Sequence, residues 1–235
     1  MLNIHKGCEP SLLSEYRKQE DADWDGPALP NGTTFSDVKQ AIRRTLYKEQ
    51  RGLCAYCMQE LPDPDAPDNT EAIINSSKTK IEHFFPRELS EGPLAYRRLD
   101  YRNMLLCCDG GTHHHSGALT CDSAKGNRVL SHVPNPASGD DIEAQLTYSH
   151  DGRLSAPQEW MEEINTVLNL NDDNLCLARK VTRSRFLKVC KERYKIRSLT
   201  TEKARYLLEK FCHRRIGYIG IILDLLRRKA ADSEH

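Results

Sequence analysis

The chain has 235 residues, of which 38% are hydrophobic and 29% charged, and its formal net charge is zero. This composition is ordinary for a globular protein with a buried core. No apolar run approaches the roughly 18 residues that a membrane span needs. The start of the chain lacks the apolar segment of a secretion signal. We therefore expect a cytoplasmic protein rather than a membrane or secreted one.

The charges are unevenly distributed between the two parts of the chain. Residues 1–150 hold 16 Lys and Arg against 22 Asp and Glu, whereas residues 151–235 hold 18 against 12. A basic C-terminal lobe is suited to nucleic-acid phosphates, because Lys and Arg neutralise backbone charge. A solvated helix surface explains the same excess. Charge alone does not separate these two interpretations.

The first predicted element is a helix that starts at Thr34 or Ser36 and ends near Gln50. Apolar residues recur every fourth position within it, and Gly52 stands where a glycine commonly ends a helix. A Pro- and Asp-rich loop over 62–68 comes next, and the pattern then predicts a short strand over 80–85. The N-terminal segment, 1–51, is thus expected to contain one helix.

The central segment, 52–130, contains the strand predicted over 80–85 and a second short element that is expected to be buried. The segment 103–108, apolar after Asn103, predicts a buried strand or turn, and Cys121 opens a short helix that Gly126 ends. The rest, 131–235, is expected to be a linker followed by a helical lobe. The last helical part has apolar residues at steps of three and four, which is typical of a core-facing stripe: Leu208, Cys212, Ile216, Ile219, Leu223 and Leu226.

Nine cysteines are an odd number, and cytosolic thiols stay reduced, so a disulfide framework is not expected. Cys54-x2-Cys57 has the spacing that puts two thiolates on one metal, and a tetrahedral structural zinc needs two more. Cys121 and either Cys107 or Cys108 are the candidates. The remaining four are expected to be small packing residues: Cys8, Cys176, Cys190 and Cys212.

Residues between the thiols suggest hydrolytic chemistry. Cleavage of a phosphodiester needs a base for water and a cation, held by ligands, that offsets charge on the phosphate. His83 is neutral and basic near pH 7, and Glu82 and Asp122 offer the oxygen ligands that Mg²⁺ or Mn²⁺ prefers. Neighbouring strand residues point to opposite faces. Glu82 and His83 therefore share one site only if the strand bends or the metal lies at its end.

The order Cys-x2-Cys, Glu-His, Asn, Cys, Cys-Asp-x2-Lys resembles the HNH nucleases with an embedded zinc ribbon. The resemblance implies an α+β fold with a ββα-metal core and a four-cysteine zinc knuckle. It implies that His83 is the general base, that Glu82 and Asp122 bind the catalytic Mg²⁺ or Mn²⁺, and that Asn103 braces the catalytic loop. The family spacing after this Asn selects Cys108 as the zinc ligand. Lys125 would face a phosphate.

A closer similarity includes Lys6-Gly7-Cys8-Glu9-Pro10, residues 50–57, residues 81–83, residues 121–127 and Leu168-Asn169-Leu170-Asn171. These motifs resemble the HNH nuclease subunits (PtuB) of Septu and retron-associated anti-phage defence systems. The resemblance implies a bacterial defence nuclease that works with a PtuA-like ATPase subunit. The expected substrate is nucleic acid, with DNA the first choice and RNA the alternative.

Several competing interpretations accompany these expectations. A non-catalytic zinc module that binds nucleic acid or a protein would keep the four cysteines but would not need the pair Glu82 and His83. Asp122 beside a helix start is also a typical N-cap, and Lys125 is also consistent with a solvated side chain. The histidines at 113–115 are expected at a loop surface or a partner contact.

Overall fold

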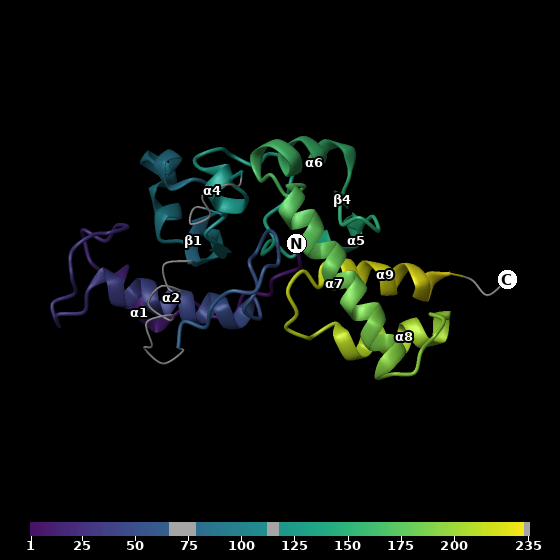
Figure 1. Ribbon diagram of the computed structural model, residues 1–235. Coiled ribbons are helices and arrows are strands. Elements are labelled where there is room, and N and C mark those ends of the chain that lie inside the picture. The colour runs from purple at the N-terminus through teal and green to yellow at the C-terminus, as the bar shows by residue number, and fades with distance from the viewer. Residues whose placement is uncertain (66–78, 112–117, 233–235) are drawn as a thin grey trace.

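The computed structural model describes residues 1–65, 79–111 and 118–232. Figure 1 shows α2 running below the small sheet and α4, while α7 crosses the middle of the molecule toward α8 and α9. The N-terminus lies at the centre, where Met1, Leu2 and Ile4 are buried in the core. The architecture is mixed, with helices and two small two-stranded sheets, as expected. The histidines at 113–115 lie outside the described residues.

The predicted N-terminal helix is confirmed as α2, Phe35–Glu49. Thr34 caps it through a capping box in which its side chain accepts from the amide of Asp37 and the Asp37 carboxylate accepts in return. The apolar positions of the expected stripe, Val38, Ile42 and Leu46, are fully buried. A short helix before it, α1 (Ser11–Tyr16), has no periodicity long enough to be predicted.

The two central strands form one antiparallel pair. β1 spans Thr79–His83 and β2 spans Met104–Cys108, with Glu82 opposite Leu105 and His83 opposite Met104. Three short 3₁₀ helices connect them: Arg87–Leu89, Gly92–Arg98 and Tyr101–Asn103. The helix α4 follows as Cys121–Lys125, with Gly126 as its C-cap, which confirms the expected start and end. α4 packs against β2, and α2 packs against both strands.

The outer edge of β2 is closed by the residues around the first cysteine pair. The Gln50 side chain accepts from the Leu106 amide at 2.7 Å and donates to the Leu106 carbonyl at 2.7 Å. The Ala55 amide also donates to that carbonyl at 3.0 Å. The end of α2 and the Cys54–Cys57 turn are thereby fixed against the strand that carries Cys108.

The segment between α4 and α7 has more regular structure than the linker expected from the sequence. It contains two helices and a second small antiparallel sheet: α5 (Ile142–Gln145), β3 (Thr147–Tyr148), β4 (Leu154–Ser155) and α6 (Gln158–Glu162), followed by a π-helical turn over Glu163–Val167. The Glu163 carboxylate accepts the amides of Ser131 at 2.7 Å and Val133 at 2.9 Å. This buried side chain supplies the acceptors that an irregular backbone needs.

The C-terminal lobe consists of α7 (Asp173–Glu192), α8 (Thr201–Phe211) and α9 (Gly220–Ala231). α9 packs against α8, α7 and β3. The expected helical lobe is confirmed, but its last apolar stripe does not lie on one helix, because residues 212–219 are not helical. The stripe still contributes to the core: Ile219, Leu223 and Leu226 are buried.

The break between α8 and α9 has a tertiary cause. The amide of Gly217 donates to the Glu60 carboxylate at 2.9 Å, and the amide of Tyr218 donates to the Met58 carbonyl at 2.8 Å. Tyr218 has a φ of 60°, which a continuous helix does not allow. Arg215 also donates to the Leu61 carbonyl at 2.7 Å. Contacts with the Cys54–Cys57 region thus replace helical hydrogen bonds that the periodicity alone predicts.

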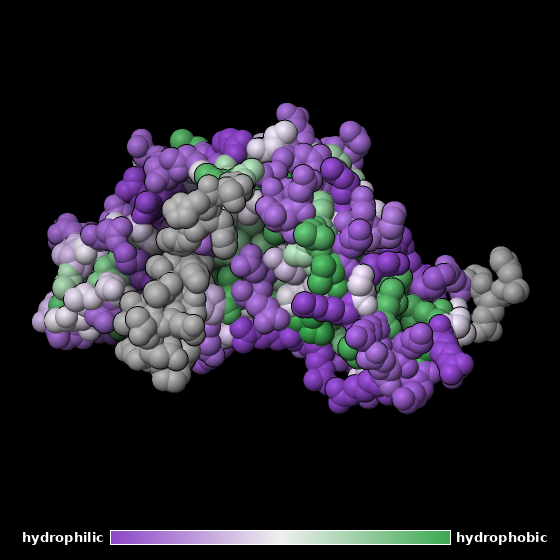
Figure 2. Space-filling model, in the orientation of Figure 1, coloured by the Kyte–Doolittle hydropathy of each residue, from purple (hydrophilic) through white to green (hydrophobic). Residues whose placement is uncertain are grey.

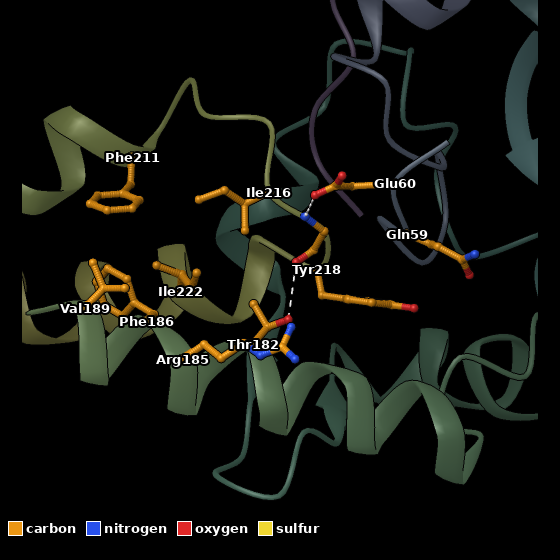
Figure 3. A pocket seen from close by; sticks show the side chains of 11 residues that line it. Gln59, Glu60, Thr182, Arg185, Phe186, Val189, Phe211, Ile216, Tyr218 and Ile222 are labelled. Atoms are coloured by element: carbon orange, nitrogen blue, oxygen red, sulfur yellow. Dashed lines mark hydrogen bonds between the residues drawn. The ribbon is translucent and has the colours of Figure 1, made fainter. Parts of the chain in front are cut away.

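An apolar pocket of about 430 Å³ lies among α7, α8 and the segment before α9. Figure 3 shows Phe186, Val189 and Phe211 on one side and Gln59 and Glu60 toward the other. Four exposed apolar side chains lie on α7: Leu177, Val181, Leu187 and Val189. Figure 2 shows apolar residues along this helix in the centre of the view. Within the described residues, no helix combines the length and apolarity of a membrane span.

Candidate functional site

Four cysteines form a compact group of thiols. The Sγ atoms of Cys54, Cys57, Cys108 and Cys121 all lie within 4.8 Å of one another, and all four residues are buried. Cys54 and Cys121 have their sulfurs 3.9 Å apart, and Cys57 and Cys108 have theirs 3.7 Å apart. These four residues come from three places in the sequence, so the fold brings them together.

The first pair sits in a tight turn that directs both sulfurs inward. The amide of Cys54 donates to the Gln59 carbonyl at 2.9 Å, and the amide of Met58 donates to the Cys54 carbonyl at 3.0 Å. The amide of Gln59 points at the Cys57 sulfur at 3.4 Å. Met58 has a φ of 65°, in the left-handed region that closes such turns. This turn keeps two thiols of a CxxC sequence on the same side.

Cys108 ends β2, and Cys121 begins α4. Cys121 has a φ of 55°, an uncommon conformation for a residue other than glycine, and its amide donates to the Leu168 carbonyl at 2.8 Å. Strain of this kind persists only where the surroundings impose it, often at functional sites. In Cys121 this backbone conformation directs the thiol, at the first residue of α4, toward Cys54.

The four thiols fit a tetrahedral metal. Zn–S bonds of about 2.3 Å at tetrahedral angles place sulfurs about 3.8 Å apart, and the two sulfur–sulfur separations given above are 3.7 and 3.9 Å. The group could therefore hold a metal such as zinc. Cys107 is buried but lies outside this group, because adjacent strand residues face opposite sides of the sheet. The geometry thus selects Cys108 from the two alternatives.

Glu82 is buried and has three polar partners. Its carboxylate accepts from the Tyr56 hydroxyl at 3.0 Å and pairs with the Lys125 ammonium at 2.8 Å. Burial raises the pKa of Glu82, a hydrogen bond with Asp122 and the charge of Asp122 raise it further, and Lys125 opposes the rise. Two carboxyl groups this close repel each other when both are ionised. A positive charge between them would relieve that repulsion, as the Lys125 ammonium does in part.

Asp122 lies in the first turn of α4 and remains partly accessible. Its side chain is 18% exposed and lies 3.9 Å from the Lys80 ammonium. The Asp122 side chain is not an N-cap, since Thr120 occupies that position. The helix-capping alternative for Asp122 is therefore contradicted by the geometry.

His83 ends β1 and packs edge-on against Trp24, with ring centroids 4.5 Å apart. Its Nε2 lies 2.9 Å from the Arg98 carbonyl oxygen. A carbonyl only accepts, so this contact fixes the proton on Nε2 and leaves the lone pair on Nδ1. Burial lowers the pKa of His83 to about 4, against the opposing effect of that carbonyl. The imidazole is thus neutral at physiological pH and has one available basic nitrogen.

Asn103 holds the backbone that follows His83. Its side-chain oxygen accepts from the Phe85 amide at 2.7 Å, and its amide nitrogen donates to the carbonyls of Phe85 and Arg97, both at 3.0 Å. Its own carbonyl accepts from the Phe84 amide at 2.8 Å. Asn103 therefore braces both arms of the connection between β1 and β2, as the resemblance implies.

Lys125 differs from the expectation that it faces a phosphate. Its side chain is fully buried, with the ammonium 2.8 Å from Glu82 and 3.2 Å from the His83 carbonyl. Isolated ammonium groups are costly to bury, so the negative charge of Glu82 explains its position. The solvated alternative is contradicted as well. Lys125 is an internal counter-ion that orients Glu82.

One cleft of about 430 Å³ collects the three proposed reactive side chains, Glu82, His83 and Asp122. Glu82 and His83 are neighbours in β1, and neighbouring strand residues point to opposite faces. Both line the same cleft because His83 is the last residue of the strand. Four cations and an aromatic ring that the sequence did not single out complete its walls: Trp24, Lys39, Arg43, Lys80 and Arg87. They come from a loop, from α2, from β1 and from the 3₁₀ helix Arg87–Leu89, so no linear motif marks them.

Comparisons with known proteins add no family to this geometry. No protein-family model matches the chain, and no curated protein matches its sequence. The arrangement of the site is therefore the basis for assigning a function.

Proposed function

We propose that this protein is a metal-dependent nuclease of the HNH, or ββα-metal, kind. The observation that carries the proposal is the shared cleft of Glu82, His83 and Asp122, at the end of an antiparallel strand pair followed by a short helix. A strand pair and a helix that present a histidine and carboxylates to one cleft are what the resemblance to HNH nucleases implies. The substrate class is nucleic acid, with DNA as the first choice.

His83 acts as the general base. Its Nδ1 takes a proton from a water molecule while Nε2 stays bonded to the Arg98 carbonyl, so the imidazole keeps one orientation throughout. The edge contact with Trp24 holds the other side of the ring. Asn103 fixes the backbone on which the ring is mounted. The activated water attacks phosphorus, the bond between phosphorus and the 3′-oxygen breaks, and the 3′-oxygen takes a proton from solvent. The products carry a 5′-phosphate and a 3′-hydroxyl.

Glu82 and Asp122 would hold one Mg²⁺ or Mn²⁺, which supplies charge stabilisation at the phosphate and the leaving oxygen. Lys125 and Tyr56 orient the Glu82 carboxylate from the inner side. Asp122 lines the same cleft, and its side chain remains partly exposed. Preorganised supports of this type keep ligands in place for a metal that binds through only a few protein groups.

The four cysteines would hold a structural zinc. The site is closed, with four sulfurs and no position for water or substrate, which is typical of structural rather than catalytic zinc. It joins the Cys54–Cys57 turn to the end of β2 and the start of α4. Zinc there would fix Asp122, which is the next residue after Cys121.

The test is cleavage by the purified protein of plasmid DNA, linear DNA and total RNA, with and without added Mg²⁺ or Mn²⁺. We expect cleavage that requires the divalent metal and that falls by about 10²- to 10⁴-fold in His83→Ala. His150→Ala changes an exposed histidine elsewhere and serves as the matched control. Wild-type cleavage by the His83 variant would contradict the base. Binding of nucleic acid without any metal-dependent cleavage would favour the non-catalytic zinc module.

We also propose, from the resemblance to PtuB, a role in anti-phage defence together with a PtuA-like ATPase subunit. Its support is the set of similar motifs between residues 6 and 171. Co-expression with such an ATPase should give one complex in size-exclusion chromatography. Separate elution of the two proteins would contradict the partnership without affecting the nuclease proposal.

A further inference from the structure

Arg43 is a cation in the cleft without a counter-ion. It lies on α2 one turn after Lys39 and is half-buried. Its Nε is buried and has no hydrogen-bond partner, and it forms no ion pair, among residues 1–65, 79–111 and 118–232. Burial lowers the pKa of Arg43, and no charged group opposes this effect. The free protein therefore leaves one buried guanidinium nitrogen of a half-buried arginine without a partner.

The other cations of the cleft differ from Arg43 in this respect. Lys39 pairs with Asp25 at 2.6 Å, and Arg87 lies 3.8 Å from the same carboxylate. Lys80 donates to the Ser123 hydroxyl at 2.8 Å. Each of these three has a polar partner within the protein, so only Arg43 in this set of four is left to interact with a ligand.

The missing partner has a definite chemistry. A guanidinium presents planar N–H donors that match two oxygens of a phosphate or a carboxylate, and it stays charged at any working pH. The position of Arg43 in the proposed nuclease cleft makes a phosphodiester the anion that would enter. Arg43 forms no ion pair with Glu82 or Asp122, so its charge stands apart from the metal-binding pair.

We propose that Arg43 binds a non-reacting backbone phosphate of the nucleic-acid strand that occupies the cleft, next to the phosphate that is cut. This inference rests on the proposed function and deepens it. Arg43 is a substrate-positioning residue: it fixes the register of the strand relative to His83. Lys39, one turn away on the same face of α2, adds positive charge beside this position.

The experiment measures binding of a fluorescein-labelled DNA duplex, and of an RNA duplex of the same length, without added Mg²⁺ or Mn²⁺ and over a range of salt concentrations. Omitting these cations, rather than adding a chelator, keeps cleavage out of the readout and leaves the thiol site undisturbed. Arg43→Gln should weaken binding about 10-fold, because a charge-assisted hydrogen bond is lost. The slope of log K against log salt should become shallower by about 0.9 on the DNA duplex. The variant makes one phosphate contact fewer, so its binding releases fewer counterions. Arg43→Lys should retain the slope but not the full affinity.

Arg44→Gln is the matched control. Arg44 is the next residue on α2, is exposed, and pairs with Asp65 outside the cleft. It should bind like the wild type. The melting temperature of Arg43→Gln should equal or exceed that of the wild type, because a half-buried charge without a counter-ion is removed. In Mg²⁺, its KM should rise more than its kcat falls.

The outcomes separate the two proposals. Unchanged affinity and slope in Arg43→Gln, with cleavage that still depends on His83, would overturn the phosphate site and leave the nuclease standing. A reduced slope in a protein that never cleaves with Mg²⁺ or Mn²⁺ would support the phosphate site and overturn the nuclease. A wild-type protein that neither binds nor cleaves either nucleic acid would overturn both.

Discussion

The two candidate metal sites of this protein are built in opposite ways. The four thiols are completely enclosed, and their geometry is set by the turn at Cys54–Cys57 and by the ends of β2 and α4. The carboxylates Glu82 and Asp122 instead border an open cleft, with an internal cation behind Glu82. A closed sulfur site provides stability, whereas an open oxygen site provides reactivity. The two differ although Cys121 and Asp122 are consecutive residues.

Removal of one thiol should have the largest effect and would test the enclosed site. Cys108→Ala should lose one zinc per chain and unfold most of the fold, because a structural zinc contributes on the order of 10 kcal/mol of folding free energy. Cys107→Ala is the matched control, since Cys107 is equally buried but outside the group of four. Zinc content by mass spectrometry and thermal melting provide the measurements. Equal zinc loss in both variants would contradict the assignment.

Removal of the buried counter-ion should come next. Lys125→Met leaves Glu82 buried without its counter-ion, which should lower the free energy of unfolding by about 3–5 kcal/mol when no Mg²⁺ or Mn²⁺ is added. Chemical denaturation in buffer without these cations and without a chelator measures this. The double variant with Glu82→Gln should recover much of the loss, because the unpaired charge is gone. Additive losses in the double variant would show that the two side chains are not coupled.

The open site is tested by the change Asp122→Asn. It keeps the shape of the side chain but removes a charge, so Mn²⁺ should bind at least 10- to 100-fold more weakly, the loss typical of even an outer-shell partner. Zinc content should stay unchanged. Titration calorimetry with Mn²⁺ gives the affinity. Wild-type Mn²⁺ affinity would remove Asp122 from the ligand set.

Removal of the Asn103 side chain, which braces the connection between β1 and β2, should have the smallest effect. Asn103→Ala removes hydrogen bonds to Phe85 and Arg97 and should cost about 1–3 kcal/mol of unfolding free energy. Cleavage should fall as well, because His83 loses its fixed backbone, while zinc stays bound. Asn174→Ala, at an exposed position of α7, is the control. A free energy of unfolding equal to that of this control would show that the hydrogen bonds of Asn103 do not stabilise the fold.

The sequence predicted local elements better than the contacts between them. The spacing of Val38, Ile42 and Leu46 predicts α2, because a helix that buries one face has apolar residues at a period of about 3.6. The thiols were predicted as a set because metal chemistry restricts their residue type. The break at residues 212–219 was missed, since it depends on acceptors at Met58 and Glu60 that are remote in the chain.

The candidate site was predicted only in part, for the same reason. Glu82, His83 and Asp122 lie in short motifs, so their types and neighbours suggested chemistry. The inward position of Lys125 depends on three-dimensional burial beside Glu82. Arg43 and Trp24 come from separate segments, and only the folded chain brings them to the cleft. The resemblance therefore suggested the three side chains of the proposed reactive centre but not the other side chains of the cleft.

The contacts between the Cys54–Cys57 region and the start of α9 have a mechanical consequence. Met58, Glu60 and Leu61 bind the backbone or side chains of residues 215–218, and Arg51 donates to the Cys212 carbonyl. A chelator that strips the thiols of metal would thus also release the hinge between the last two helices. Amide exchange at Tyr218 would then accelerate along with exchange at Cys54, which makes the C-terminal lobe a reporter of metal occupancy.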